Sequence, residues 1–293
     1  MNRKMGERAR EWTGRTDGKP WMHSSLIWLM RFLPIRFFYG VMDIVVVFYL
    51  LFAKPRRQAA CHYWQQIHGK SRGASWWHTY LHFRTFGKAI VDRFAAYAGR
   101  QFTYTLEGNE AVEEAMSQGN GCILLASHIG NYEMAGYALH PIRPMFAVMF
   151  GGEKEHVLKN RQRMLEQNGI HILTQDDEMG YIYAINNVLS NGDMLTVFAD
   201  RHFGSDKSIV LPVLGKEASL PKGPFAIAQL YPEATVVCTF VMKESTHGYR
   251  VFVRRLQGKK AADFAQAYAE TVTEIVTRYP YQWYNFYEFW KKD

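Results

Sequence analysis

Beyond Gly99 the sequence alternates between short apolar runs and longer segments with helical periodicity, and this alternation constrains the fold more than any other feature. The runs are four to six residues long, which is the length of strands rather than helices. Continuous apolar strands separated by helices are typical of a parallel sheet covered on both faces. The predicted strands cover 122–126, 145–150, 170–173 and 194–199, and the predicted helices start near Tyr132 and cover 154–168 and 179–190.

The pattern changes toward the C-terminus. Two apolar runs, 235–242 and 249–256, flank a short turn, which predicts an antiparallel hairpin. Helices are predicted near 223–230 and over 263–279, the second with Asp263 as its N-cap. We therefore predict an α/β fold with a mostly parallel central sheet flanked by helices.

The N-terminal part contains one long apolar run in place of several short ones. Residues 37–53 form an apolar run of 17 residues, about 26 Å long as a helix, against a hydrocarbon core of about 30 Å. Asp43 lies inside the run, and basic residues flank both of its ends, so the positive-inside bias points both ways. We expect a membrane-associated helical segment that lies in or dips into one leaflet; the alternative is a buried helix of a soluble core.

Charge is unevenly distributed along the chain. The first 100 residues carry 17 Lys or Arg and five Asp or Glu, whereas the whole chain has a net charge of +8. Such a basic segment favours nucleic acid, anionic lipid or an acidic partner. Because its aromatic residues recur at helical spacing beside the apolar run, core packing and membrane docking explain it better than nucleic-acid binding.

Residues 56–99 carry apolar and aromatic side chains at intervals of three, four and seven, which predicts one long helix. His78 and His82 are four residues apart on it, a spacing that two metal ligands can have. Neither Glu nor Cys stands beside them, so we expect solvated or hydrogen-bonded histidines and no metal site.

The segment LLASHIGNYEMAG (124–136) carries the clearest chemical pattern, because His128 follows a buried strand and Glu133 lies in the first turn of the next helix. Residues five apart on one helix do not face each other, but across a strand-to-helix turn they can. The Glu133 carboxylate would then hold one imidazole nitrogen and leave the other as a base. The alternative is a helix-capping turn with a surface histidine.

Ser127 precedes His128, but it lacks the G-x-S-x-G turn that exposes a nucleophilic serine. We therefore expect Ser127 to be a neighbour of the site and not a nucleophile. Without a nucleophile in the protein, the natural partner of His128 is a hydroxyl on a bound substrate. The pattern thus favours acyl transfer.

These residues resemble the lysophospholipid acyltransferase superfamily, and within it the late, or secondary, lipid A biosynthesis acyltransferases with their HX4E motif, here His128 and Glu133. The resemblance covers about 25–290, because other blocks agree in the same order. These blocks are HFRTFGKAIVD (82–92), the helix that contains Arg161, NGDMLTVFADRHFG (191–204), LPVLGKEASLPKGPFAIAQ (211–229) and Pro280-x-Gln282-Trp283.

The resemblance implies that His128 is the general base on the acceptor hydroxyl and that Glu133 orients it. The hydroxyl would attack the thioester of an acyl carrier protein, or of coenzyme A, without an acyl-enzyme intermediate and without a further cofactor. The oxyanion that forms needs donors. Candidate donors and substrate-binding groups are the amides at Gly130 and Asn131, the guanidinium of Arg161 with Arg163 as second choice, and Asp200 and Arg201.

The sequence departs from the family pattern at two places. Arg201 and His202 follow Asp200 where a second acidic residue is usual, and 284–290 reads YNFYEFW where the family has His and Arg pairs. The expected acceptor is a hydroxyl of a lipid A precursor or related glycolipid. The alternatives are an amino-acid lipid, a lysophospholipid or a polyene lipid, and a thioesterase or lipid hydrolase activity.

We predict a basic N-terminal membrane-anchoring segment over 1–57 and an acyltransferase catalytic domain over 58–293. The first 20 residues are polar and do not form a secretory signal, and three distant cysteines fit a reducing compartment. The expected location is the cytoplasmic side of the cell inner membrane, with acyl carrier protein and an anionic lipid or glycolipid as partners.

Overall fold

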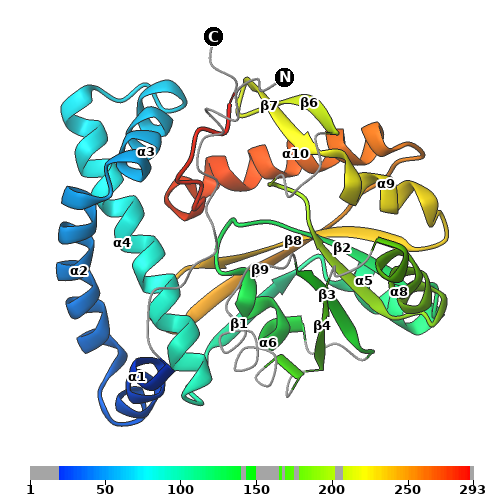
Figure 1. The fold of residues 1–293 in the computed structure, drawn as a ribbon, viewed down its shortest axis with the longest axis horizontal. Helices are drawn as coiled ribbons and strands as arrows, with labels where there is room; N and C mark the ends of the chain where they lie inside the picture. Colours follow the sequence, from blue (N-terminus) through cyan, green and yellow to red (C-terminus); the bar gives the residue numbers. More distant parts are fainter. Residues whose placement is uncertain are drawn as a thin grey trace, which may run out of the picture.

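The computed structural model describes residues 20–139, 143–149, 165–166, 169–174, 178–201 and 207–290. A seven-stranded sheet with the order β1-β9-β8-β2-β5-β3-β4 forms the centre of the fold (Figure 1). Its strands are β1 (Thr103–Glu107), β2 (Cys122–Ala126), β3 (Met145–Met149), β4 (Ile170–Thr174), β5 (Met194–Phe198), β8 (Thr235–Lys243) and β9 (Gly248–Arg255).

The sheet is mostly parallel, which confirms the predicted fold class. Strands β8, β2, β5, β3 and β4 run in one direction, and each pairs with its neighbours in parallel register. Strand β9 pairs antiparallel with β8 as the predicted hairpin, and β1 joins the free edge of β9 in parallel. Carboxyl ends of adjacent parallel strands therefore meet at one edge of the sheet, where sites form in open α/β folds.

Helices cover both faces of the sheet, which explains why its central strands are apolar throughout. In β2, Ile123 and Leu125 join one core with α8, α9 and α10, whereas Cys122 and Leu124 join a second core with α4, α5 and α6. Side chains alternate between the faces of a strand, so both faces need apolar residues. These helices are α4 (Arg72–Tyr97), α5 (Glu110–Gln118), α6 (Ala135–Leu139), α8 (Glu178–Ser190), α9 (Lys222–Leu230) and α10 (Ala261–Arg278).

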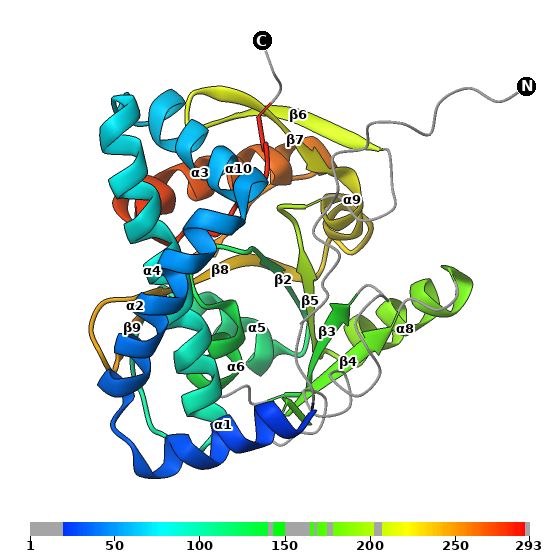
Figure 2. The same cartoon turned by 60° about the vertical axis from the view of Figure 1, so that its left-hand side comes forward.

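The N-terminal helices α1 (Pro20–Phe32) and α2 (Ile35–Phe52) lie against α4 at one side of the sheet, and Figures 1 and 2 both show α2 alongside α4. Among the described residues, α2 is long and apolar enough to cross a membrane by length and composition, and 22% of it is buried. Asp43 of α2 forms an ion pair with Arg84 of α4, with N···O distances of 2.7 and 2.9 Å.

Several element predictions need correction. The single helix predicted over 56–99 is two helices, α3 (Lys54–Gln66) and α4, separated by a turn with Gly69 at a φ of 61°. Asp263 lies at the third position of α10, where its carboxylate accepts from the amide of Lys260, the N-cap. We did not predict β1, α5 or the hairpin β6 (Ser208–Val213) and β7 (Lys216–Pro221). Of the helix predicted over 154–168, only residues 165–166 are among the described residues.

Candidate active site

His128 and Asp200 lie at the carboxyl ends of the adjacent strands β2 and β5, although 72 residues separate them. The ring Nδ1 of His128 contacts Asp200 Oδ1 at 2.9 Å, and the backbone amide of His128 donates to Asp200 Oδ2 at 2.8 Å. The two oxygens of one carboxylate therefore hold both the ring and the backbone of the histidine. A histidine held in this way by a carboxylate has the geometry that a base and its orienting group need in an acid–base site.

Asp200 is almost fully buried, with 4% of its surface exposed. Burial alone would raise its pKa, but His128 and Arg201 outweigh burial and hold the pKa of Asp200 below its ordinary value. The carboxylate is therefore ionised at neutral pH and can only accept hydrogen bonds. Nδ1 must then carry the proton, so in the neutral ring Nε2 carries the lone pair that accepts a proton.

Glu133, which we expected to orient His128, contacts α4. Its carboxylate forms an ion pair with Arg93 at 3.0 Å and accepts a hydrogen bond from Tyr97 at 2.7 Å. The short 3-10 helix η1 (Tyr132–Met134) begins directly after the turn and carries Glu133 to this face of α4. The structure thus gives the Nδ1 position to Asp200, whereas Glu133 fixes the turn to a neighbouring helix.

The backbone amides of Gly130 and Asn131, which we expected to donate to the oxyanion, donate to other parts of the protein. Gly130 N donates to Gln282 O at 2.6 Å, and Asn131 N donates to Val241 O at 2.8 Å. A backbone amide has one proton, so in this structure these groups stabilise the turn and are not available to an oxyanion. Gly130 has a φ of 67°, and a Cβ on it would lie 2.2 Å from Val241 O, so only glycine fits this close approach.

Ser127 is buried, and its Oγ accepts from the amide of Ile129 at 3.3 Å. This position agrees with a neighbour of the site. Arg161 and Arg163, the predicted guanidinium donors, and His202 lie outside the described residues. His78 and His82 each have a hydrogen-bond partner, as discussed below.

The C-terminal segment 280–290 covers the His128–Asp200 pair. Its residue Tyr284 donates from its amide to His128 O at 3.3 Å, and Tyr287 donates from its hydroxyl to Asp200 O at 3.5 Å. Arg201, a predicted substrate-binding residue, donates to Tyr284 O at 2.9 Å and lies over the Tyr287 ring. Sequence reasoning missed this packing role, although the density of aromatic residues in the segment was a signal for it.

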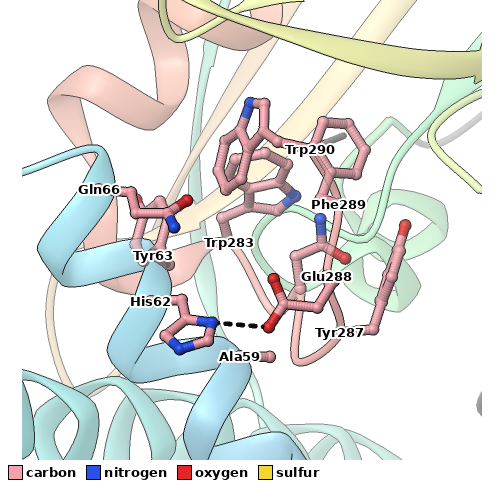
Figure 3. Close-up of a pocket in the computed structure, with 10 residues that line it drawn as sticks. Ala59, His62, Tyr63, Gln66, Trp283, Tyr287, Glu288, Phe289 and Trp290 are labelled. Carbon is pink, nitrogen blue, oxygen red and sulfur yellow. Dashed lines mark hydrogen bonds and ion pairs between the residues drawn. The ribbon is translucent and has the colours of Figure 1, made fainter. Parts of the chain in front are cut away.

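Helices α3 and α4 hold the C-terminal segment in place. Figure 3 shows Glu288 facing His62 of α3, with 2.8 Å between Oε1 and Nδ1, beside an aromatic pocket. On α4, His78 Nδ1 contacts the Tyr281 hydroxyl at 2.5 Å, and His82 Nε2 donates to Trp283 O at 2.7 Å. His78 and His82, four residues apart on α4, are thus part of the contact between α4 and the C-terminal segment.

A comparison with protein-family models matches residues 16–292 to the bacterial lipid A biosynthesis acyltransferase model. The chain belongs to this family. It is therefore an acyltransferase, its family acts on a lipid acceptor, and family members are generally membrane-associated. No curated protein matches the sequence.

Proposed function

We propose that this acyltransferase moves a fatty acyl chain from an acyl carrier protein or coenzyme A thioester to a hydroxyl of a lipid A precursor or related glycolipid. The observation that carries the proposal is the pairing of His128 with the ionised Asp200 at the edge of the sheet. In that pair Nε2 accepts the hydroxyl proton while the oxygen bonds to the thioester carbonyl carbon. The tetrahedral intermediate then collapses, the carbon–sulfur bond breaks, and the thiolate takes the proton back from His128.

The proposed reaction needs no cofactor besides the thioester. Arg161 is still our candidate donor to the oxyanion, on the resemblance alone, because both turn amides donate within the protein. Asp200 supports the imidazolium that forms when His128 takes the proton, as a buried carboxylate does in other acid–base sites.

We further propose that α1 and α2 seat the protein on the cytoplasmic face of the inner membrane. Large apolar side chains of α2 are exposed, among them Ile44, Phe48 and Phe52. The acidic residue in this helix, Asp43, faces α4 and is paired there, so its charge is satisfied away from the exposed apolar side chains. Exposed aromatics of α1 and basic residues at the ends of α2 suit an interfacial helix that lies along the bilayer and does not cross it.

An acceptor other than a lipid A precursor is the second candidate. Residues 284–290 form an aromatic cover over the acid–base pair and contain no His or Arg. An amino-acid lipid, a lysophospholipid or a polyene lipid would make fewer demands on basic groups there. Mass spectrometry of lipids from cells with and without the gene separates these acceptors, because each gains a different mass when acylated.

His128→Ala tests the proposed mechanism. Loss of a general base lowers turnover by about 10²- to 10⁴-fold, and we expect this with lauroyl-loaded acyl carrier protein and a lipid A precursor in detergent. His247→Ala, at the exposed tip of the β8–β9 hairpin, is the matched control and should keep wild-type turnover. A folded His128→Ala protein that acylates at more than a tenth of the wild-type rate would contradict the mechanism, and product formed without acceptor would indicate a hydrolase.

A further inference from the structure

Asp92 of α4 is a fully buried carboxylate at a distance from the acid–base pair. It accepts hydrogen bonds from the hydroxyls of Tyr39 and Tyr249 and from Lys243 Nζ, the last at 2.5 Å. An isolated buried carboxylate is costly, and these three donors, one of them a cation, satisfy it. The cluster joins α2, α4, β8 and β9.

The cluster also reaches the turn that carries His128. Asn131 Nδ2 donates to the Tyr249 hydroxyl at 3.2 Å and to Ala89 O of α4 at 3.1 Å. Asn131 is 3% exposed, and its backbone amide is bonded to β8 as described above. Asp92 is therefore two hydrogen bonds from the turn, through one tyrosine.

The donors around Asp92 fix the directions of the hydrogen bonds that lead from it to Asn131. Asp92 accepts from Tyr39, Lys243 and Tyr249, so Tyr249 uses its one hydroxyl proton on Asp92. The Tyr249 oxygen can then only accept from Asn131, which forces the amide nitrogen of Asn131, and not its oxygen, toward Tyr249 and Ala89 O. One side-chain orientation of Asn131 is thus selected from two.

We infer that Asp92 is a positioning residue for the acyl transfer reaction, acting through Tyr249 and Asn131 on the turn that holds His128. The inference rests on the proposed role of His128. Tyr39 and Lys243 satisfy the carboxylate but have no contact with the turn among those described. Only the Tyr249 branch should therefore control the placement of the base.

Two tyrosine variants separate this role from simple stabilisation, because both remove one hydroxyl from the same carboxylate. Tyr249→Phe also removes one of the two acceptors of Asn131 Nδ2. We expect kcat to fall about tenfold, with KM for the acyl donor and the lipid acceptor changed less than twofold. Tyr39→Phe keeps the path to Asn131 and should lower kcat less than threefold. Tyr104→Phe, whose ring stacks on Tyr249, should keep wild-type kcat.

The measurement uses the full chain with lauroyl-loaded acyl carrier protein and a lipid A precursor in detergent, and thermal unfolding shows whether each variant is folded. Asn131→Ala completes a double-mutant cycle with Tyr249→Phe. We expect the double variant to lose no more kcat than the worse single variant. Additive losses, or equal losses in Tyr249→Phe and Tyr39→Phe, would overturn the inference.

Failure of the proposed function would look different. If His128→Ala were active, the base would be misassigned whatever the tyrosine variants did. If His128→Ala were inactive and Tyr249→Phe kept kcat within twofold of the wild type, only the positioning role of Asp92 would be rejected. Asp92→Asn gives an independent result. An amide at this position can donate to the Tyr249 hydroxyl, which reverses the direction of the hydrogen bonds between Asp92 and Asn131, so kcat should fall at least as far as in Tyr249→Phe.

Discussion

Asp200 holds His128 by two atoms, and an amide cannot replace it. In Asp200→Asn the amide nitrogen replaces one of two oxygens. Oδ1 lies 2.9 Å from Nδ1, and Oδ2 accepts from the His128 amide at 2.8 Å and lies 3.2 Å from Nδ1, so at either place the nitrogen puts a donor where an acceptor is needed. With nitrogen against Nδ1, the ring carries its proton on Nε2 and cannot act as a base.

We therefore expect Asp200→Asn to lower kcat by about 10²- to 10⁴-fold while the protein stays folded. Asp193→Asn is the matched control, because Asp193 precedes β5 at the opposite edge of the sheet. Steady-state kinetics on both variants test this prediction. A wild-type kcat in Asp200→Asn would show that the reaction does not need the Asp200 carboxylate.

The sequence pointed to both His128 and Asp200 as candidates, yet it paired His128 with Glu133, whereas in the structure Asp200 contacts Nδ1 and Glu133 contacts α4. The step from strand to turn is local, so His128 could be found from the apolar run before it. The contact with Asp200 depends on β2 and β5 being neighbours in the sheet, which no spacing within 72 residues of chain encodes. Glu133 is closer to His128 in sequence than Asp200 is, but across a turn a short sequence separation did not predict which carboxylate contacts the ring.

At the level of elements, α4 and the C-terminal segment are joined by a neutral histidine. His82 is fully buried, and burial lowers its pKa from 6.5 to about 4. Between these pH values the unfolded chain binds a proton that the folded chain does not, so stability must fall as pH falls. The full effect is on the order of 3 kcal/mol.

Urea unfolding at pH 7 and pH 5 measures this effect. His82→Gln keeps a donor for Trp283 O but has no such titration, so its stability should change less between the two pH values than that of the wild type. His247→Gln, on an exposed turn, should follow the wild type. Equal pH dependence in all three proteins would show that His82 is not the titrating group.

Strands could be predicted from the sequence where both of their faces are buried. The central strands pack on both faces and are apolar throughout, so their runs stand out. Strands β1 and β6 have partly exposed side chains in alternation and were not predicted. The break between α3 and α4 was missed because the helical spacing was judged over the whole of 56–99, although 68–73 carries no apolar side chain and Gly69 provides the turn.

For the whole molecule, the exposed apolar surface of α2 predicts lipid binding. Ile44 is 62% exposed on α2, and Leu230 is 72% exposed on α9 at the far side of the sheet. We expect Ile44→Glu to weaken binding to phosphatidylglycerol vesicles at least about tenfold, because burying a charge in the bilayer boundary is costly.

Leu230→Glu adds the same charge at an equally exposed apolar site and should bind like the wild type. Vesicle sedimentation measures both, and turnover on a detergent-soluble acceptor should be the same in each. Equal binding by the two variants would place the membrane contact elsewhere.

The strand order also sets the sequence of events while the chain is being made. Asp92 precedes its cationic partner Lys243 by 151 residues, and β2 cannot gain its β8 neighbour until that same stretch has left the ribosome. Pairings across such distances form late. Helix α2 is complete long before then, so its apolar side chains are available to lipid while the sheet is still open, and attachment to the bilayer can precede the assembly of the acid–base pair.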